Sequence, residues 1–288
     1  MITRRQWLKT LLATGTVTTL SLPGWAVTRE DSVKVALLES IFTGQEREKV
    51  IEQIKPFAEI IKKDTGTDAV FDVMNYAEME KEFKAGKVQL VILSGLEFAW
   101  MQAVTPDAKP LLVASIDPGA TKTVIVTKQG DVAKDLKDLA GASLAIPDKI
   151  PFISQQVLKT ALGQSAEKAF KLVKSGNVDD TLEEVLDGKA RGAIVTGAGM
   201  EVFRERKPGR FKKLKVVFES PDLPPTTVMY NDKVTDKAAL ARFKDALIKS
   251  NEKPEGNRVL TLYKLKGFEP FPEGFEKKAA EMGKAYPQ

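Results

Sequence analysis

The residue types that most often carry catalysis are scarce in this chain. It has no cysteine and no histidine among its 288 residues, which excludes a thiolate nucleophile, a disulfide and a Ser-His-Asp triad. A catalytic site would need a carboxylate pair or a lysine, and Glu97 and Lys122 are the loop residues that qualify. They form no coherent constellation. The sequence therefore favours a protein that binds without catalysing a reaction, and we expect no metal and no cofactor.

Two loops that follow expected strands carry candidate ligand-binding residues. Ser94 and Gly95 end an apolar strand and open a helix. Their N–H groups either face a cleft, since ligands of α/β sheets bind at the carboxyl ends of strands, or form an ordinary helix cap. Phe42 and Thr43 follow the first strand, and Phe42 either stacks on a ligand or packs into the core.

A third group of candidates lies where we expect the chain to pass from one lobe to another. Thr121, Lys122 and Thr123 directly precede or begin a β-branched run. Lys122 is a candidate cation for an anionic ligand. The alternative is a solvent-facing lysine of a hinge, because lysine is rarely buried without a partner.

The elements that position these residues follow from hydrophobic patterning. Residues 46–63 repeat apolar side chains at helical spacing, which predicts a helix with one buried face. Continuous apolar runs between such helices are typical of parallel strands covered on both faces, so we expect an α/β fold with mainly parallel sheets. The expected strands are 33–38, 69–74, 88–93, 111–116, 123–127, 143–146, 169–173, 192–196, 214–218 and 227–230.

The alternation has a seam near Gln129, where a unit with an expected helix over 131–141 begins. A Pro-rich connector, 220–225, precedes the last strand. Two crossings of this kind indicate two lobes joined by a two-segment hinge, with the ligand in the cleft between them. We expect the first part of lobe 1 at 27–124, lobe 2 at 125–220, and a return segment with the C-terminal helices of lobe 1 at 221–288.

The first 26 residues predict an export signal peptide. They combine a basic head at Arg4, Arg5 and Lys9 with an apolar stretch and a small-x-small ending at Ala26. The segment around Arg4 and Arg5 resembles a twin-arginine signal; an ordinary secretory signal and a short amphipathic anchor helix are the alternatives. We expect a periplasmic protein that begins near Val27.

Charge gives little sign of a nucleic-acid partner. The formal net charge is +5. It falls to +2 without residues 1–26, since these carry three basic residues and no acidic one. Elsewhere acidic and basic residues are interleaved, and the locally basic run 204–215 is expected to be a surface loop. We therefore expect a monomer that binds no nucleic acid and is not embedded in a membrane.

Four stretches together resemble the phosphate/phosphite/phosphonate-type periplasmic solute-binding proteins of ABC transporters. The resemblance covers essentially all of 31–274 and implies the two-lobed periplasmic binding protein fold of type II, a small-molecule ligand and an ABC permease as partner. The four stretches are 86–91 with Ser94-Gly95, 123–126 with 135–141, 175–193, and 220–225.

The departures from the family pattern bear on the ligand. Val178 stands where the family has His, and the anion loop 148–154 keeps one hydroxyl, Ser154, whose alternative role is a cap. Asp179 matches an acidic family position, or serves the helix dipole. Arg191 stands where the family's acid meets the ammonium group of an aminophosphonate. Arg191 either binds a carboxylate or sulfonate of the ligand through two hydrogen bonds, or forms an inter-lobe salt bridge with an acid such as Asp179.

These observations predict a periplasmic solute-binding protein that delivers a small anionic solute to an ABC transporter by cleft closure. The solute would be phosphonate- or phosphate-like, or another oxyanion. The alternative is a non-transport periplasmic accessory or sensor-input protein of the same fold that binds a partner or an apolar ligand, which the eroded anion loop and Val178 motivate. An enzyme on the same fold would depend on Glu97 or Lys122.

Overall fold

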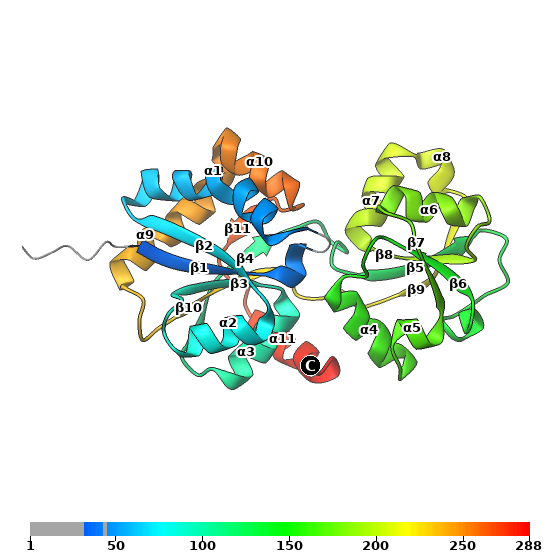
Figure 1. Ribbon diagram of the computed structural model, residues 1–288, viewed down its shortest axis with the longest axis horizontal. Helices are drawn as coiled ribbons and strands as arrows, with labels where there is room; N and C mark the ends of the chain where they lie inside the picture. Colours follow the sequence, from blue (N-terminus) through cyan, green and yellow to red (C-terminus); the bar gives the residue numbers. More distant parts are fainter. Residues whose placement is uncertain (1–31, 43–44) are drawn as a thin grey trace, which may run out of the picture. The chain divides into compact units, whose positions relative to one another are not determined.

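The computed structural model describes residues 32–42 and 45–288. The expected signal peptide and Thr43 lie outside them. The described chain builds two sheets flanked by helices, which confirms the α/β class (Figure 1). Ser32–Gln288 form one compact unit. None of the helices described is long and apolar enough to cross a membrane.

The first sheet has six strands in the order β11-β4-β10-β3-β1-β2. Its central strand β3 is buried along its whole length, as the apolar run in the sequence predicts. The strands are β1 (Ser32–Leu38), β2 (Asp68–Met74), β3 (Leu90–Leu93), β4 (Ala108–Ser115), β10 (Thr227–Asn231) and β11 (Gly267–Glu269).

Helices cover both faces of this sheet (Figure 1). Apolar side chains of α1, α9 and α10 form the core on one face, and those of α2, α3 and α11 form the core on the other. The helix expected over 46–63 is α1, which ends in a left-handed glycine, Gly66, whose N–H bonds to the Lys62 carbonyl. The bounds are α1 (Arg47–Thr65), α2 (Tyr76–Lys84), α3 (Gly95–Val104), α9 (Lys237–Ile248), α10 (Pro254–Leu262) and α11 (Phe275–Ala285), with 3₁₀ turns at Glu39–Phe42 and Lys249–Glu252.

The second sheet has five strands in the order β7-β6-β8-β5-β9. Side chains of α4 and α5 pack on one face, and those of α6 and α7 pack on the other. The strands are β5 (Thr123–Lys128), β6 (Ser143–Ile146), β7 (Lys171–Lys174), β8 (Gly192–Thr196) and β9 (Leu214–Glu219). The helices are α4 (Phe152–Leu162), α5 (Ala166–Ala169), α6 (Val178–Leu186), α7 (Gly197–Arg206) and α8 (Pro208–Phe211), with a 3₁₀ turn at Lys137–Leu139.

Both sheets are mixed, whereas the apolar runs predicted mainly parallel pairing. β1 pairs in parallel with β2 and β3, and β6 pairs in parallel with β7 and β8. β10 runs antiparallel to β3 and β4, and β5 runs antiparallel to β8 and β9. β5 and β10 directly follow the two segments that connect the sheets. The lobe boundaries remain a prediction, and Thr123 and Val124, assigned above to lobe 1, belong to β5 of the second sheet.

Two local expectations are wrong. Residues 131–141 form no α-helix, because the Asp135 carboxylate accepts from the Lys137 amide and the Asp138 carboxylate accepts from the Lys134 amide. Such side-chain bonds to the backbone replace the helical ladder. The basic run 204–215, expected as a surface loop, contains the end of α7, the whole of α8 and the start of β9.

Candidate functional site

A pocket of about 670 Å³ opens where strands of both sheets end. The loops after β1, β2, β3 and β6 supply much of its wall, and the carboxyl ends of parallel strands are where α/β proteins bind ligands. We call it the central pocket. Its lining residues are Leu38, Glu39, Ser40, Phe42, Gln45, Tyr76, Glu97, Ile146, Asp148, Lys149, Ile150, Phe152, Gln155, Glu167, Leu172 and Lys174.

Glu97 contributes a buried carboxyl group to this pocket. It lies in the first turn of α3, three residues after the N-cap Ser94, and is 1% exposed. The Ser40 hydroxyl donates to its two oxygens at 3.0 and 2.9 Å, and the Ser94 hydroxyl donates to one of them. Burial raises the pKa of Glu97 to about 7, although the hydrogen bonds from Ser94 and Ser40 oppose that shift. Glu97 therefore ties the loop after β1 to the start of α3.

Tyr76 places a phenol group in the same pocket. It is the first residue of α2, which Asn75 caps by accepting from the Glu78 amide. The Tyr76 hydroxyl oxygen is buried and has no hydrogen-bond partner among the described residues. Burial raises the pKa of this hydroxyl above its ordinary value, so it stays protonated. A buried hydroxyl without a partner is costly.

Aromatic rings form a row from Tyr76 through Trp100 to Phe152, and of the three Tyr76 and Phe152 line the pocket. Tyr76 meets Trp100 edge to face, with ring centroids 6.1 Å apart, and Trp100 meets Phe152 in the same way at 6.0 Å. The Trp100 indole N–H donates to the Tyr286 carbonyl at 3.1 Å, which fixes the ring. Trp100 belongs to α3 and Phe152 begins α4, so these rings connect elements of the two sheets.

The part of the pocket built by the second sheet carries both signs of charge. Asp148 and Lys149 follow β6, and Lys174 ends β7. Lys149 and Lys174 have no ion-pair partner among the described residues. The N-cap of α4 is Pro151, which offers no side-chain acceptor to the first-turn N–H groups.

The candidates at the crossing segments hold the two segments together. Thr121 donates its hydroxyl to the Leu223 carbonyl at 2.7 Å, and the Thr123 amide donates to the Ser220 hydroxyl at 3.0 Å. Thr123 is fully buried and its hydroxyl donates to Ser154 at 2.9 Å. Lys122 pairs with Glu219, whose hydrogen bond raises the lysine pKa. Lys122 thus has an acidic partner of its own in this structure.

Ser94 and Gly95 form the cap of α3 next to the return segment. The Ser94 hydroxyl accepts from the Glu97 amide. A Cβ on Gly95 would lie 2.4 Å from the Cβ and the carbonyl oxygen of Pro224, so the connector packs directly on this glycine. Ser94, Thr121 and Ser154 line a separate cavity of about 150 Å³ beside these segments. The structure brings these three together but does not place them on the central pocket.

Phe42 packs mainly into the core of the first sheet. It is 6% exposed and meets Tyr263 edge to face, with centroids 4.9 Å apart. It also forms part of the central pocket's wall.

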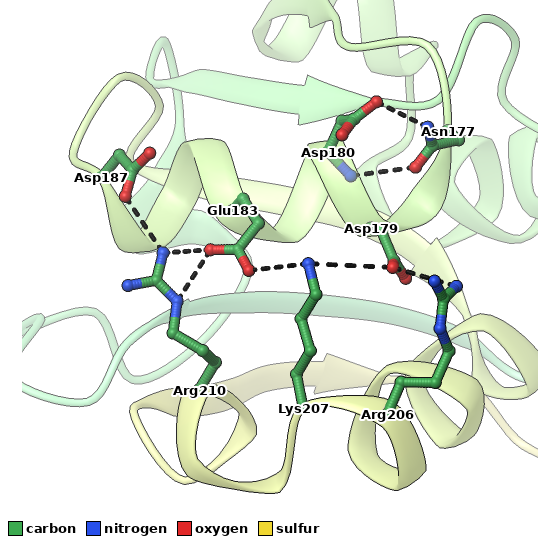
Figure 2. A network of polar contacts seen from close by, with 8 residues as sticks. All are labelled: Asn177, Asp179, Asp180, Glu183, Asp187, Arg206, Lys207 and Arg210. Carbon is green, nitrogen blue, oxygen red and sulfur yellow. Dashed lines mark hydrogen bonds and ion pairs between the residues drawn. The ribbon is translucent and has the colours of Figure 1, made fainter.

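Asp179 belongs to a network of ion pairs within the second sheet's helices. Arg206 approaches its carboxylate to 3.1 Å and Lys207 to 3.8 Å. Figure 2 shows Lys207 between Asp179 and Glu183, with Arg210 reaching Glu183 from α8. This network ties α6 to α7 and α8. Asp179 also lines a second pocket, of about 590 Å³, at the start of α6.

Both expectations for Arg191 are wrong. Its guanidinium donates two hydrogen bonds to the Asp131 carboxylate, of 3.0 and 3.1 Å. It donates a third to the Asp138 carbonyl at 3.0 Å. Its amide bonds to the carbonyl of Ser143, which begins β6. Arg191 therefore lies at the amino ends of β6 and β8, opposite the carboxyl end of β6 that reaches the central pocket. Its bidentate partner is Asp131, not Asp179 and not a ligand.

Sequence reasoning missed Tyr76, Glu39, Lys149 and Lys174 as pocket residues, and it considered Glu97 only for catalysis. One signal was present. Asn75 follows a predicted strand just as Ser94 does, so it marks a second helix start at the same edge of the sheet. Lys149 lies in the expected anion loop 148–154 but was not singled out there, and Lys174 carries no comparable signal.

Comparison with protein families matches residues 40–273 of the chain. The family is described as "ABC transporter, phosphonate, periplasmic substrate-binding protein". The sequence has no significant match among curated proteins.

Solved structures of binding proteins share the fold. PhnD1 from Prochlorococcus marinus (MIT 9301), in complex with methylphosphonate, is 16% identical with a TM-score of 0.60; the match covers 88% of this chain and 98% of that one. XAC2383 from Xanthomonas citri, bound to ATP, is 14% identical with a TM-score of 0.63, covering 89% and 97%. A binding protein component of an ABC phosphonate transporter from Pseudomonas aeruginosa is 14% identical with a TM-score of 0.60, covering 88% and 85%.

Proposed function

Because this chain belongs to the periplasmic phosphonate-type substrate-binding protein family of ABC transporters, we propose that it binds a small solute in the central pocket and delivers it to an ABC permease. Binding needs no chemistry on the solute, and the protein is proposed not to be an enzyme. The solute would touch loops of both sheets. It would then favour a closed form of the protein that the permease recognises.

The observation that carries this proposal is the Tyr76 hydroxyl. It is buried and lacks a partner among the described residues, and Tyr76 is one of the residues that line the 670 Å³ pocket. In a protein without a ligand, a buried hydroxyl with no hydrogen-bond partner lowers the stability of the fold, and nothing compensates for this loss. Its position at the carboxyl end of β2 supports a role in contacting solute.

The proposed solute carries an acidic group, as phosphonates, phosphates, sulfonates and carboxylates do. Lys149 and Lys174 support this, because both line the pocket without an ion-pair partner among the described residues. The first turn of α4 adds the positive end of a helix dipole close to Phe152. Lys122, proposed from the sequence as a cleft cation, is a weaker candidate because Glu219 already neutralises it.

The test is a thermal-shift screen of the protein with phosphonates, phosphite, sulfonates, carboxylates and their amino-substituted analogues. A solute at a hundred times its dissociation constant adds about 2.7 kcal/mol to the free energy of unfolding. Native mass spectrometry of gently purified protein would detect a solute that co-purifies.

Tyr76→Phe locates the binding site. Without solute, its stability should equal or exceed that of the wild type by about 1 kcal/mol, since the costly hydroxyl is gone. Its solute affinity should fall about tenfold. Tyr263→Phe is the matched control, because its hydroxyl bonds to Gln53 at 2.9 Å outside the central pocket. Silence across the screen, or equal affinity in Tyr76→Phe, would contradict the proposal. Silence would favour the accessory protein that docks a partner.

A further inference from the structure

The second sheet has an edge that takes no part in the central pocket. Strands β6, β7, β8 and β9 begin at this edge and β5 ends there, because β5 runs antiparallel to β8 and β9 while β6 runs parallel to β7 and β8. The pocket uses the opposite, carboxyl ends of β6 and β7. Segments 128–138, 187–191 and 210–215 therefore lie away from the pocket.

Three sets of contacts join these segments into one surface. The Gln129 amide donates to the Lys213 carbonyl at 2.8 Å. The Lys215 ammonium donates to the Asp131 carbonyl at 2.8 Å, and the Arg191 guanidinium binds the Asp131 carboxylate. The three segments are thus held side by side, and their side chains can meet the same partner at once.

This surface, which we call the lysine face, carries exposed lysines without acidic partners. Two of its acids are already neutralised, since Asp131 accepts from Arg191 and Asp187 accepts from Arg210 (Figure 2). The exposed lysines of the lysine face, none with an ion-pair partner among the described residues, are Lys128, Lys134, Lys137, Lys189, Lys212 and Lys213.

The lysine face concentrates the positive charge of the chain. Its three segments hold nine basic and four acidic residues, a formal charge of +5. All described residues together carry only +3, so the rest of the described chain is net negative. None of the six lysines lines the central pocket or the two other cavities described above. Their charge therefore favours an extended anionic surface over a small enclosed anion.

An apolar side chain projects from the same face. Val132 is 82% exposed, the highest value among the exposed large apolar side chains of the described residues. Its loop is held in place, because the Asp131 carboxylate accepts from the Ala133 amide at 2.7 Å as well as from Arg191. An apolar side chain next to lysines suits the boundary between lipid headgroups and acyl chains, where burial of apolar area adds to attraction by anionic lipids.

We propose that the lysine face binds the surface of a bilayer that contains anionic lipids, with Val132 entering the headgroup region. Each lysine close to such a surface strengthens binding about fivefold. The protein would then rest on the membrane by the end of the second sheet that lies opposite the central pocket, which leaves the pocket open to solute. This inference is independent of which solute the pocket binds.

A fluorescent label at position 132 tests the contact directly. The chain has no cysteine, so Val132→Cys provides a single attachment site for an environment-sensitive dye. Vesicles of phosphatidylcholine with about one third phosphatidylglycerol should shift the emission to the blue, and about 1 M salt should reverse the shift by screening. Pure phosphatidylcholine vesicles should have no effect. Val70→Cys is the matched control, because Val70 is 49% exposed on β2 of the first sheet, and its label should not respond.

Charge removal tests the lysines. Replacing Lys189, Lys212 and Lys213 together by Gln should lower the affinity for the anionic vesicles about a hundredfold in co-sedimentation of the full chain. The fold should be unaffected, because these side chains are exposed and unpaired among the described residues. The control variant should stay within about threefold of the wild type. It removes the same charge from exposed lysines of α1 and α11 without ion pairs among the described residues, Lys55, Lys63 and Lys278.

Three results would overturn the proposal. The first is that the wild type does not bind anionic vesicles. The second is that it binds them while the label at position 132 stays unchanged, since another part of the chain would then make the contact. The third is an equal loss of affinity in the two triple variants. Binding to soluble polyglutamate without binding to vesicles would assign the lysine face to an acidic protein instead.

Discussion

At the scale of the residue, the Glu97 carboxyl ionises less readily in the folded chain than in water. Burial raises its pKa from 4.5 to about 7. Below pH 4.5 the carboxyl is protonated in the folded and unfolded chain alike. Between pH 4.5 and 7 the unfolded chain releases the proton and the folded one retains it, so stability falls as the pH rises. The loss is on the order of 3 kcal/mol, since each unit of pKa difference is about 1.4 kcal/mol.

Glu97→Gln should therefore lose this part of the pH dependence. Chemical denaturation at pH 4 to 8 measures it as the difference between variant and wild type. The variant should gain stability relative to the wild type as the pH rises through this window. A difference that stays constant from pH 4 to 8 would show that Glu97 ionises freely in the fold.

At the scale of the element, the close approach of α3 to the return segment is the most sensitive feature. Gly95→Ala would drive a Cβ into Pro224, which we expect to cost about 1–3 kcal/mol. Gly209→Ala is the matched control, because nothing lies within 4 Å of the position that its new methyl group would take. It should be neutral or slightly stabilising. Denaturation midpoints compare the two; equal effects would mean that Pro224 yields at little cost.

A substitution of Arg191 tests whether the role of this residue is structural. Arg191→Met removes the bidentate contact with Asp131, and the melting temperature should fall. Solute affinity should stay within about twofold, because Arg191 lies at the amino end of β6, opposite the carboxyl end that reaches the central pocket. A large loss of affinity in a well-folded Arg191→Met protein would return this residue to the binding site.

The sequence predicted most strands because they are continuous apolar runs. It placed β6 and β8 at their observed bounds. It failed where local hydrogen bonds compete, as at Asp135 and Asp138, and where a run is short and half polar, as in β11. Arg191 was misplaced because which end of a strand meets the pocket depends on strand direction in the sheet. Spacing alone does not give that direction.

At the scale of the whole molecule, the proposed transport role requires a change of form on binding. The central pocket is lined by loops of both sheets, and two hydrogen-bonded segments connect those sheets. Solute should therefore lower the radius of gyration measured by small-angle scattering. An unchanged radius at saturating solute would exclude closure while leaving binding intact.

The most direct test of solute binding in the central pocket uses Trp100. The chain has three tryptophans, and Trp7→Phe with Trp25→Phe leaves Trp100 alone as a reporter beside Tyr76 and Phe152. A fluorescence titration with the solutes of the thermal-shift screen should show a saturable change for a solute that binds, weakened about tenfold by Tyr76→Phe. No change with any solute, together with the mass of the chain alone in native mass spectrometry, would contradict the account.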